Sequence, residues 1–334
     1  KLGPIGMIET LEAAKKHPHY SAPLGPRQAR GVASGFWFNI GGETSSSITI
    51  NEDGTVGLTL GTPDIGGSRA SMAMMASEEL GIPMEKIKPV IGDTNSLGFN
   101  FLTGGSRATF STGTTVVKST REAIEKLKKR AALLWEVTLE QVEWIDGHAR
   151  LISGNEPKTM SLSQIAKQAG KTGGPIMANC SMNVTGAGPS LGTHIVDVEV
   201  DEETGRVSIV RYTAIQDAGK AIHPAYVEGQ LQGGAVQGIG WALNEEYIYN
   251  DKGELENTGF LDYRIPVCSD VPMIDTVIVE VPNPNHPYGV RGVGETPIIP
   301  PLAAISNAVS RATNKRFTEL PLSPPKVLAK LMHG

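Results

Sequence analysis

Apolar and polar positions alternate in several short runs along the chain, and a period of two predicts β-strands. Three hairpins follow from this alternation: 46–51 with 56–60, 141–152, and 194–200 with 206–212. The first two turn at Asp53-Gly54 and Asp146-Gly147, and Asp-Gly between such runs is a strong hairpin signal. Further strands are predicted at 87–91, near Tyr247 and at 277–281.

Other stretches have the helical period instead. Apolar residues recur every three or four positions after Ser68, and the pattern stops at Gly81. The same reasoning predicts helices at 1–20, 111–135, 224–243 and 301–313. Hairpins interleaved with helices predict an α+β fold rather than a doubly wound parallel sheet.

Three regions are expected along the chain. An N-terminal helix and link occupies 1–44 and packs with the second lobe or with a partner. A first α+β lobe covers 45–160 and a second covers 161–334. This division gives a fold of two lobes, each built from hairpins and helices.

The composition excludes several classes of protein. No run of about 18 apolar residues occurs, which argues against a membrane span, and no signal-peptide pattern opens the chain. A net charge of −5 gives no attraction to nucleic acid. The basic cluster at 126–130 is better explained as a solvated helix face than as a nucleic-acid patch. We therefore expect a cytoplasmic protein that binds neither nucleic acid nor membrane.

The cysteine content limits which metal centres this chain can hold. The sequence contains only Cys180 and Cys268, which are far apart. Two thiols cannot by themselves hold an iron–sulfur cluster or a structural zinc ion. Any electron-transfer cluster is therefore expected on another polypeptide. No histidine, cysteine and carboxylate residues are spaced as metal ligands, so a metal would have to arrive within an organic cofactor.

One carboxylate stands in an unusual setting. Glu295 follows Gly292-Val293-Gly294 and precedes a predicted helix. Glycines let the backbone approach a ligand closely and permit positive φ angles. From spacing alone, the favoured interpretation is a glutamate that interacts with exposed N–H groups at a helix start.

Two loops share a Gly-Gly-Ser-Arg sequence. The first comprises Gly66, Gly67, Ser68 and Arg69, and the second comprises Gly104, Gly105, Ser106 and Arg107. Each precedes a predicted helix, and helix N-termini together with arginine suit a phosphate group. Two such loops suggest a ligand with more than one phosphate. Two ordinary turns at helix starts explain the pattern equally well.

A third stretch, 229–240, is rich in glycine, alanine and glutamine. Small residues at close intervals let a helix pack tightly against a neighbour, and glutamine amides can both donate and accept hydrogen bonds. Tight packing alone is the slightly favoured interpretation.

Together these stretches resemble the xanthine dehydrogenase and aldehyde oxidase family of molybdenum hydroxylases. The resemblance extends from about residue 30 to the end and rests on six motifs: 61–66, 104–113, 217–224, 229–240, 262–266 and 292–295. Gly-Val-Gly-Glu before a proline-rich helix start is the most specific of them. The resemblance covers only the C-terminal half of the family's molybdopterin subunit. It implies a split subunit, similar to the medium molybdopterin chain of nicotinate dehydrogenases.

The resemblance also implies roles for individual residues. Glu295 matches the family's general base, and Gln230 matches a glutamine that hydrogen-bonds the pterin. Ser106 and its neighbours match the loop that holds the cofactor's pyrophosphate. The complete set of implied cofactor-binding residues is Gly66, Gly67, Ser68, Arg69, Gly104, Gly105, Ser106, Arg107, Thr109, Ser111, Gln230 and Gly294. One position departs from the family pattern, because Gly67 stands where many relatives have a glutamine that meets the metal ligand.

The implied cofactor is molybdenum bound to molybdopterin cytosine dinucleotide, with a terminal sulfido or selenido ligand. Implied partners are a large molybdopterin subunit that supplies the N-terminal half, an FAD subunit and a [2Fe–2S] subunit. The implied reaction is hydroxylation of a small heteroaromatic substrate with water as the oxygen source. Nicotinate leads, ahead of purines and aldehydes. A non-catalytic scaffold that grips a phosphorylated ligand is the competing hypothesis.

Overall fold

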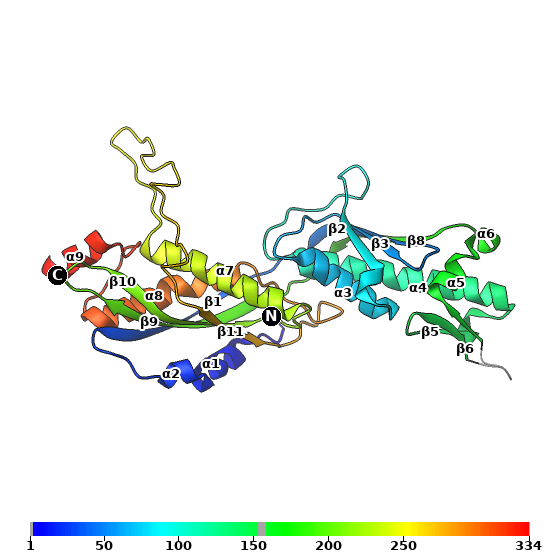
Figure 1. The fold of residues 1–334 in the computed structure, drawn as a ribbon, viewed down its shortest axis with the longest axis horizontal. Coiled ribbons are helices and arrows are strands. Elements are labelled where there is room, and N and C mark those ends of the chain that lie inside the picture. The colour runs from blue at the N-terminus through cyan, green and yellow to red at the C-terminus, as the bar shows by residue number, and fades with distance from the viewer. Residues whose placement is uncertain (1–2, 153–157, 334) are drawn as a thin grey trace. The chain divides into compact units, whose positions relative to one another are not determined.

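The computed structural model describes residues 3–152 and 158–333, which form two compact units. Unit 1 comprises residues 1–39, 189–283 and 291–334, and unit 2 comprises 40–188 and 284–290. Both contain sheets covered by helices (Figure 1). The predicted α+β fold is confirmed.

Unit 1 is built on a four-stranded sheet of order β1-β9-β10-β11. Its elements are α1 (Met7–Lys16), α2 (Pro18–Ser21), β1 (Gln28–Trp37), β9 (Ser190–Val200), β10 (Val207–Asp217), α7 (Pro224–Leu243), β11 (Ile274–Val279), η4 (Thr296–Ile298), α8 (Ile299–Thr313) and α9 (Pro324–His333). The chain passes from β10 through α7 into β11, which runs parallel to β10. The other two pairings are antiparallel.

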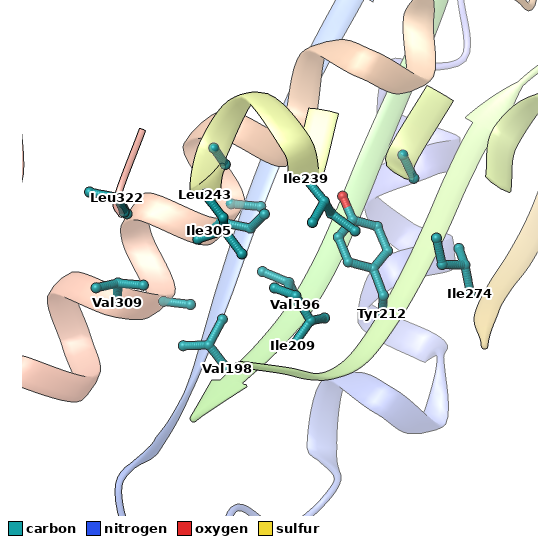
Figure 2. Close-up of a cluster of buried hydrophobic side chains, with 14 of the residues drawn as sticks. Val196, Val198, Ile209, Tyr212, Ile239, Leu243, Ile274, Ile305, Val309 and Leu322 are labelled. Carbon is teal, nitrogen blue, oxygen red and sulfur yellow. The ribbon is translucent and has the colours of Figure 1, made fainter. Parts of the chain in front are cut away.

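The sheet of unit 1 is buried on both faces. Alternate residues of β9, such as Val196 and Val198, point into a core shared with α7 and α8, which also contains Tyr212 and Ile305 (Figure 2). Ile195 points to the opposite face, where α1 covers it. Because both faces of the sheet are covered, β9 is almost completely buried, including the polar side chains of His194 and Asp197.

Unit 2 contains a sheet of order β4-β3-β2-β8 and a smaller sheet of order β5-β6-β7. Its elements are β2 (Gly42–Ile50), β3 (Val56–Leu60), α3 (Ser68–Leu80), η1 (Met84–Lys86), β4 (Ile87–Ile91), η2 (Ala108–Thr112), α4 (Gly113–Trp135), η3 (Leu139–Gln141), β5 (Val142–Ile145), β6 (His148–Leu151), β7 (Thr159–Ser161), α5 (Leu162–Ala166), α6 (Ala169–Thr172) and β8 (Ile176–Val184). The helix α3 connects the parallel strands β3 and β4.

The division into units differs from the regions expected from the sequence, 1–44, 45–160 and 161–334. Residues 161–188 stay with unit 2 because β8 pairs with β2 along its length. Residues 1–39 join unit 1 because β1 pairs with β9. The predicted helix at 1–20 is present as α1 and α2, while residues 1 and 2 lie outside the described residues. The strand expected near Tyr247 was wrong, since only an isolated bridge forms there, between Tyr249 and Leu255.

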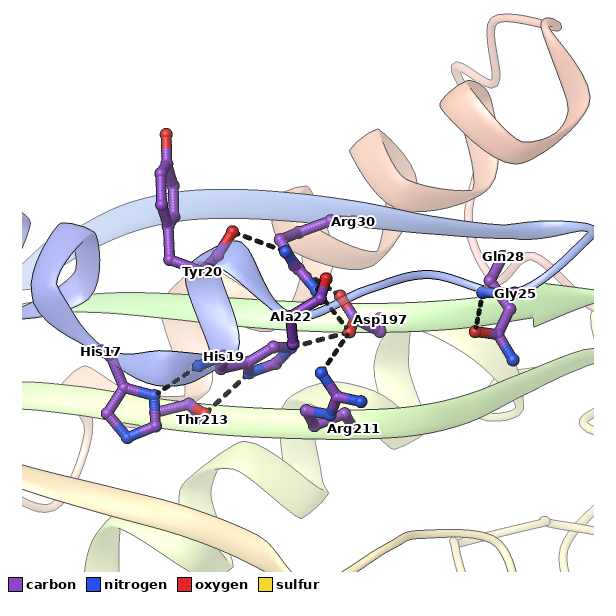
Figure 3. A network of polar contacts seen from close by, with 10 residues as sticks. All are labelled: His17, His19, Tyr20, Ala22, Gly25, Gln28, Arg30, Asp197, Arg211 and Thr213. Atoms are coloured by element: carbon purple, nitrogen blue, oxygen red, sulfur yellow. Dashed lines mark hydrogen bonds and ion pairs between the residues drawn. The ribbon is translucent and has the colours of Figure 1, made fainter.

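A buried carboxylate fastens the N-terminal segment to the sheet (Figure 3). Asp197 on β9 is 1 % exposed and accepts two hydrogen bonds of 2.8 Å from the Arg30 guanidinium. His19 Nε2 lies 3.1 Å from the same carboxylate, and Arg211 Nη1 lies 3.4 Å away. The network joins α2, β1, β9 and β10.

Candidate functional site

Glu295 lies in a short loop that leads into η4 and α8, and its side chain is partly buried. The loop is held from within the sheet. Gln216, fully buried on β10, donates from Nε2 to the Val293 carbonyl at 3.1 Å and to Ser190 Oγ at 2.9 Å. These two hydrogen bonds hold the amide nitrogen, while Oε1 of the same side chain has no partner among the described residues. Gln216 therefore fixes the backbone two residues before the Glu295 carboxylate.

A buried ion pair anchors the start of this loop. Arg291 Nε lies 3.0 Å from Asp217 Oδ2 and also donates to the Val281 carbonyl at 2.8 Å. Asp217 accepts backbone N–H groups from Gly219 at 2.9 Å and from Gly6 at 3.0 Å. Burial raises the pKa of Asp217, and these N–H donors and Arg291 only partly offset it. The side chain of Asp217 thus holds together several segments of unit 1 that are far apart in the sequence.

The glycines of helix α7 differ in how closely other elements approach them. A Cβ on Gly234 would lie 2.7 Å from Pro297, and one on Gly238 would lie 2.5 Å from Pro301, so these two glycines allow close contact with η4 and α8. By contrast, a Cβ on Gly229 or Gly233 would meet nothing within 4 Å. Tight packing therefore explains only one side of the helix.

Gln230 lies on the same helix, one turn before Gly234. Its side chain is partly buried, and Gly229 and Gly233 beside it are exposed. Because Gly234 contacts Pro297, Gln230 and Glu295 belong to neighbouring elements of unit 1. The open glycine positions leave room next to Gln230 for a flat ligand.

The first Gly-Gly-Ser-Arg loop belongs to unit 2. Gly66 and Gly67 have φ angles of 68° and 77°, a left-handed conformation that favours glycine. Asp64 already occupies the start of α3: it accepts the Arg69 backbone N–H at 3.0 Å, and its other oxygen lies 3.2 Å from Arg69 Nε. This carboxylate competes with a phosphate for Arg69, and the buried Ser68 hydroxyl donates to the Pro63 carbonyl at 3.5 Å. Backbone N–H groups are therefore the main groups of the loop left for an anion.

The second loop uses its arginine as an internal brace. Arg107 is 1 % exposed. Its guanidinium donates to four backbone carbonyls: Gly41 at 2.6 Å, Glu43 at 2.8 Å, Phe101 at 3.0 Å and Leu102 at 3.3 Å. These contacts use four of the five guanidinium N–H groups. The contacts give Arg107 a structural role, and its predicted contact with the cofactor stays a prediction.

What this brace holds is a loop in a strained conformation. Gly105 and Ser106 have φ angles of 70° and 53°, and the chain then enters the π-helical turn η2. Within η2, Thr109 is partly buried, while Ser111 is fully buried and its hydroxyl has no partner among the described residues. Gly104, the first residue of the loop, is partly buried.

His286 is a neighbour of η2 that the sequence pattern does not reveal. Its ring lies 5.9 Å from that of Phe110, and burial lowers its pKa to about 4. A neutral histidine is therefore expected there at neutral pH. The contact joins segments far apart in the sequence, so no local spacing could have predicted it. Gln216 and Arg291 went unpredicted for the same reason.

Each unit by itself has features that suit a ligand: an anionic group in unit 2 and a flat ring in unit 1. The residue before each of α3 and η2 makes no side-chain cap, although Asp64 accepts one N–H group at the start of α3, and N–H groups at helix starts attract phosphate. The open face of α7 suits a flat ring system. Within residues 3–152 and 158–333, no three histidine, cysteine or acidic side chains are grouped to hold a metal ion. In the same ranges, no helix combines the length and the apolar character that crossing a bilayer requires.

Comparisons with known proteins agree with this chemistry. Residues 9–272 match the family model of the molybdopterin cofactor-binding domain. The putative xanthine dehydrogenase molybdenum-binding subunit of Escherichia coli K12 is 33 % identical over 286 residues, which are 84 % of this chain and 38 % of that protein. The nicotine 6-hydroxylase large subunit of Paenarthrobacter nicotinovorans is 31 % identical over 316 residues, which are 91 % of this chain and 38 % of that protein.

Solved structures show the same fold. Quinoline 2-oxidoreductase from Pseudomonas putida 86 superimposes with a TM-score of 0.84 at 25 % identity, over 98 % of this chain and 43 % of that one. CO dehydrogenase from Oligotropha carboxidovorans gives a TM-score of 0.81 at 24 % identity, over 96 % and 42 %. The chain spans about two fifths of the length of these relatives. It belongs to the molybdopterin cofactor-binding domain family, among the molybdenum-binding subunits of the xanthine dehydrogenase family.

Proposed function

We propose that this chain is one part of the molybdopterin-binding subunit of a molybdenum hydroxylase, with Glu295 as its general base. The observation that carries the proposal is the setting of Glu295. Its loop is fixed by Gln216 and anchored by Arg291, and it leads into η4 and α8, which pack against Gly234 and Gly238 of α7. A carboxylate placed in this way can remove a proton at one defined position.

The cofactor, when bound, supplies two-electron redox chemistry and activates an oxygen derived from water. The chain's own residues would bind and orient it. Gln230 offers amide donors and acceptors to a pterin, and we propose that the loops of Gly66 and Gly67 and of Gly105 and Ser106 lie against the pyrophosphate. We propose the cytosine dinucleotide form, with a sulfido or selenido ligand on molybdenum.

Heteroaromatic rings are the proposed substrate class, with nicotinate favoured. Relatives named for nicotine and quinoline support a nitrogen-containing ring. The relatives named for xanthine and for aldehydes keep purines and aldehydes as the second choice. Because the chain spans 38 % of the xanthine dehydrogenase relative, we propose that a large molybdopterin subunit completes the site. FAD and [2Fe–2S] would lie on further partner subunits.

Substitution of Glu295→Gln tests the enzyme assignment against a scaffold role. The substitution keeps the size of the side chain and removes the proton acceptor. In the complex purified from its native host, we expect molybdenum content to stay at the wild-type level. Nicotinate, xanthine and an aldehyde are each assayed as substrates. Turnover of whichever substrate the wild-type complex oxidises should fall roughly 10²–10⁴-fold in the variant.

Glu203→Gln, at an exposed position between β9 and β10, is the matched control and should leave turnover unchanged. Wild-type turnover in the Glu295→Gln complex would refute the proposed base. Turnover lost in proportion to molybdenum would instead assign Glu295 a structural role and favour the scaffold hypothesis.

A further inference from the structure

A long arm, defined as residues 244–273, leaves the end of α7 and returns into β11. It runs out as an extended loop beyond the helices of unit 1 (Figure 1, yellow). Its largest apolar side chains face solvent: Phe260 is 102 % exposed, Leu261 98 % and Met273 87 %. Exposed apolar side chains gathered on one segment typically mark an interaction surface. The proposed chemistry does not use this arm, although it carries the family motif 262–266.

The arm has internal structure that fixes its shape. Asn257 accepts the Ile248 backbone N–H at 3.0 Å and donates to the Glu246 carbonyl at 2.6 Å. Tyr263 donates its hydroxyl to Glu245 at 2.8 Å, and this hydrogen bond raises the pKa of Tyr263 to about 12. A segment ordered by such contacts loses little entropy when it binds.

The same segment forms a hollow of about 410 Å³. Its lining residues are Tyr247, Leu255, Asn257, Thr258, Gly259, Phe260 and Tyr263. Tyrosine and phenylalanine are enriched at the centres of protein–protein interfaces, where they fill or form pockets. The hollow is therefore suited to receive an apolar side chain of a partner.

We propose that the arm docks onto the polypeptide that carries the portion of the molybdenum-binding subunit absent from this chain. The inference rests on the proposed function and adds the contact surface. Relatives are more than twice as long as the region that they share with this chain, so their remaining length is available to cover the arm.

The charge of the arm argues against two other partners. The arm has seven acidic and two basic side chains. Contact with the arm of a second copy would bring two acidic surfaces together, and an anionic membrane would repel the arm in the same way. The expected partner therefore presents an exposed apolar side chain with basic residues around it.

A photo-crosslinking experiment tests the assignment directly. Phe260 is replaced by benzoyl-phenylalanine in the full chain, and the complex is assembled in its native host, irradiated, digested and analysed by mass spectrometry. We expect the crosslinked peptide to belong to a polypeptide that resembles the unmatched part of the relatives. A crosslink to another copy, or to an FAD or iron–sulfur subunit, or no crosslink at all, would overturn the proposal.

A double substitution gives a second readout. Phe260→Ser with Leu261→Ser should lower the amount of that polypeptide recovered per chain at least about tenfold. Met332→Ser, which removes a 70 % exposed apolar side chain from α9, should leave recovery unchanged. Equal recovery for both variants would also overturn the proposal. Neither readout uses turnover. The docking proposal can therefore fail while the Glu295 assignment stands, and the Glu295 assignment can fail while the docking proposal stands.

Discussion

Arg69 and Arg107 occupy the same place in two copies of one short sequence, yet their surroundings are opposite. Arg69 is half-exposed and pairs with Asp64, whereas Arg107 is buried among carbonyls. Burial lowers the pKa of Arg107, although nothing in the site removes its charge. The residue type alone therefore predicted phosphate binding for both arginines. The tertiary contacts, which the sequence pattern does not show, determine how far each guanidinium is available to a ligand.

Replacement of Arg107→Met should loosen unit 2 near the proposed pyrophosphate loop. Four carbonyls would lose a charged donor inside the protein, at a cost of about 3 kcal/mol. Hydrogen exchange of residues 101–112 in the assembled complex should speed up accordingly. Arg69→Met removes only a solvent-screened pair and should cost less than about 1 kcal/mol. Equal exchange in both variants would contradict the assigned brace.

At the scale of elements, the close approach of β1 to α8 depends on glycine. A Cβ on Gly31 would lie 1.9 Å from the Ala304 carbonyl oxygen and 2.7 Å from the Ala308 nitrogen. Both are helix backbone atoms, which cannot move without shifting α8. Since α8 follows directly from the loop of Glu295, this contact also supports the candidate base.

Gly31→Ala should therefore force β1 and α8 apart and destabilise unit 1 by about 3 kcal/mol, as overpacking does. Urea unfolding of the chain measures the change. Gly57→Ala in β3 is the matched control, because its Cβ would lie 3.8 Å from the nearest atom. That control should change the free energy of unfolding by less than about 1 kcal/mol. A similar loss in both variants would show that glycine in a strand, rather than the contact, is responsible.

The sequence predicted those elements whose formation depends on neighbouring residues in the chain. The three hairpins and the helix 224–243 formed as expected, because turn chemistry and periodicity lie within a few residues. β1 was missed because its glycines, needed against α8, lower its strand propensity. β8 and α9 were missed as well. The roles of Glu295 and Gln230 stay predictions from the resemblance. Gln216 could not be predicted from the sequence, since its hydrogen bond to the loop exists only once β10 meets it.

At the scale of the whole molecule, the carboxylate of Asp197 joins the N-terminal segment to the sheet of unit 1 (Figure 3). Burial raises its pKa, but hydrogen bonds and charge from His19 and Arg30 outweigh burial, so the net pKa lies below its ordinary value. A carboxyl whose pKa is lower in the folded state stabilises that state above the unfolded pKa. The contribution disappears as pH falls through the folded pKa.

Asp197→Asn tests this dependence. At pH 7 the variant leaves Arg30 without its charged partner and should be less stable by about 3 kcal/mol. As pH falls below about 4, the ordinary value for aspartate, wild type loses its advantage and the two free energies of unfolding should converge. The raised pKa of Asp217 acts in the opposite direction, but it is present in both proteins and cancels from the difference. Urea unfolding between pH 7 and pH 3 measures both curves. A constant gap across that interval would mean that Asp197 contributes through packing rather than through its charge, and the N-terminal segment would then be held independently of pH.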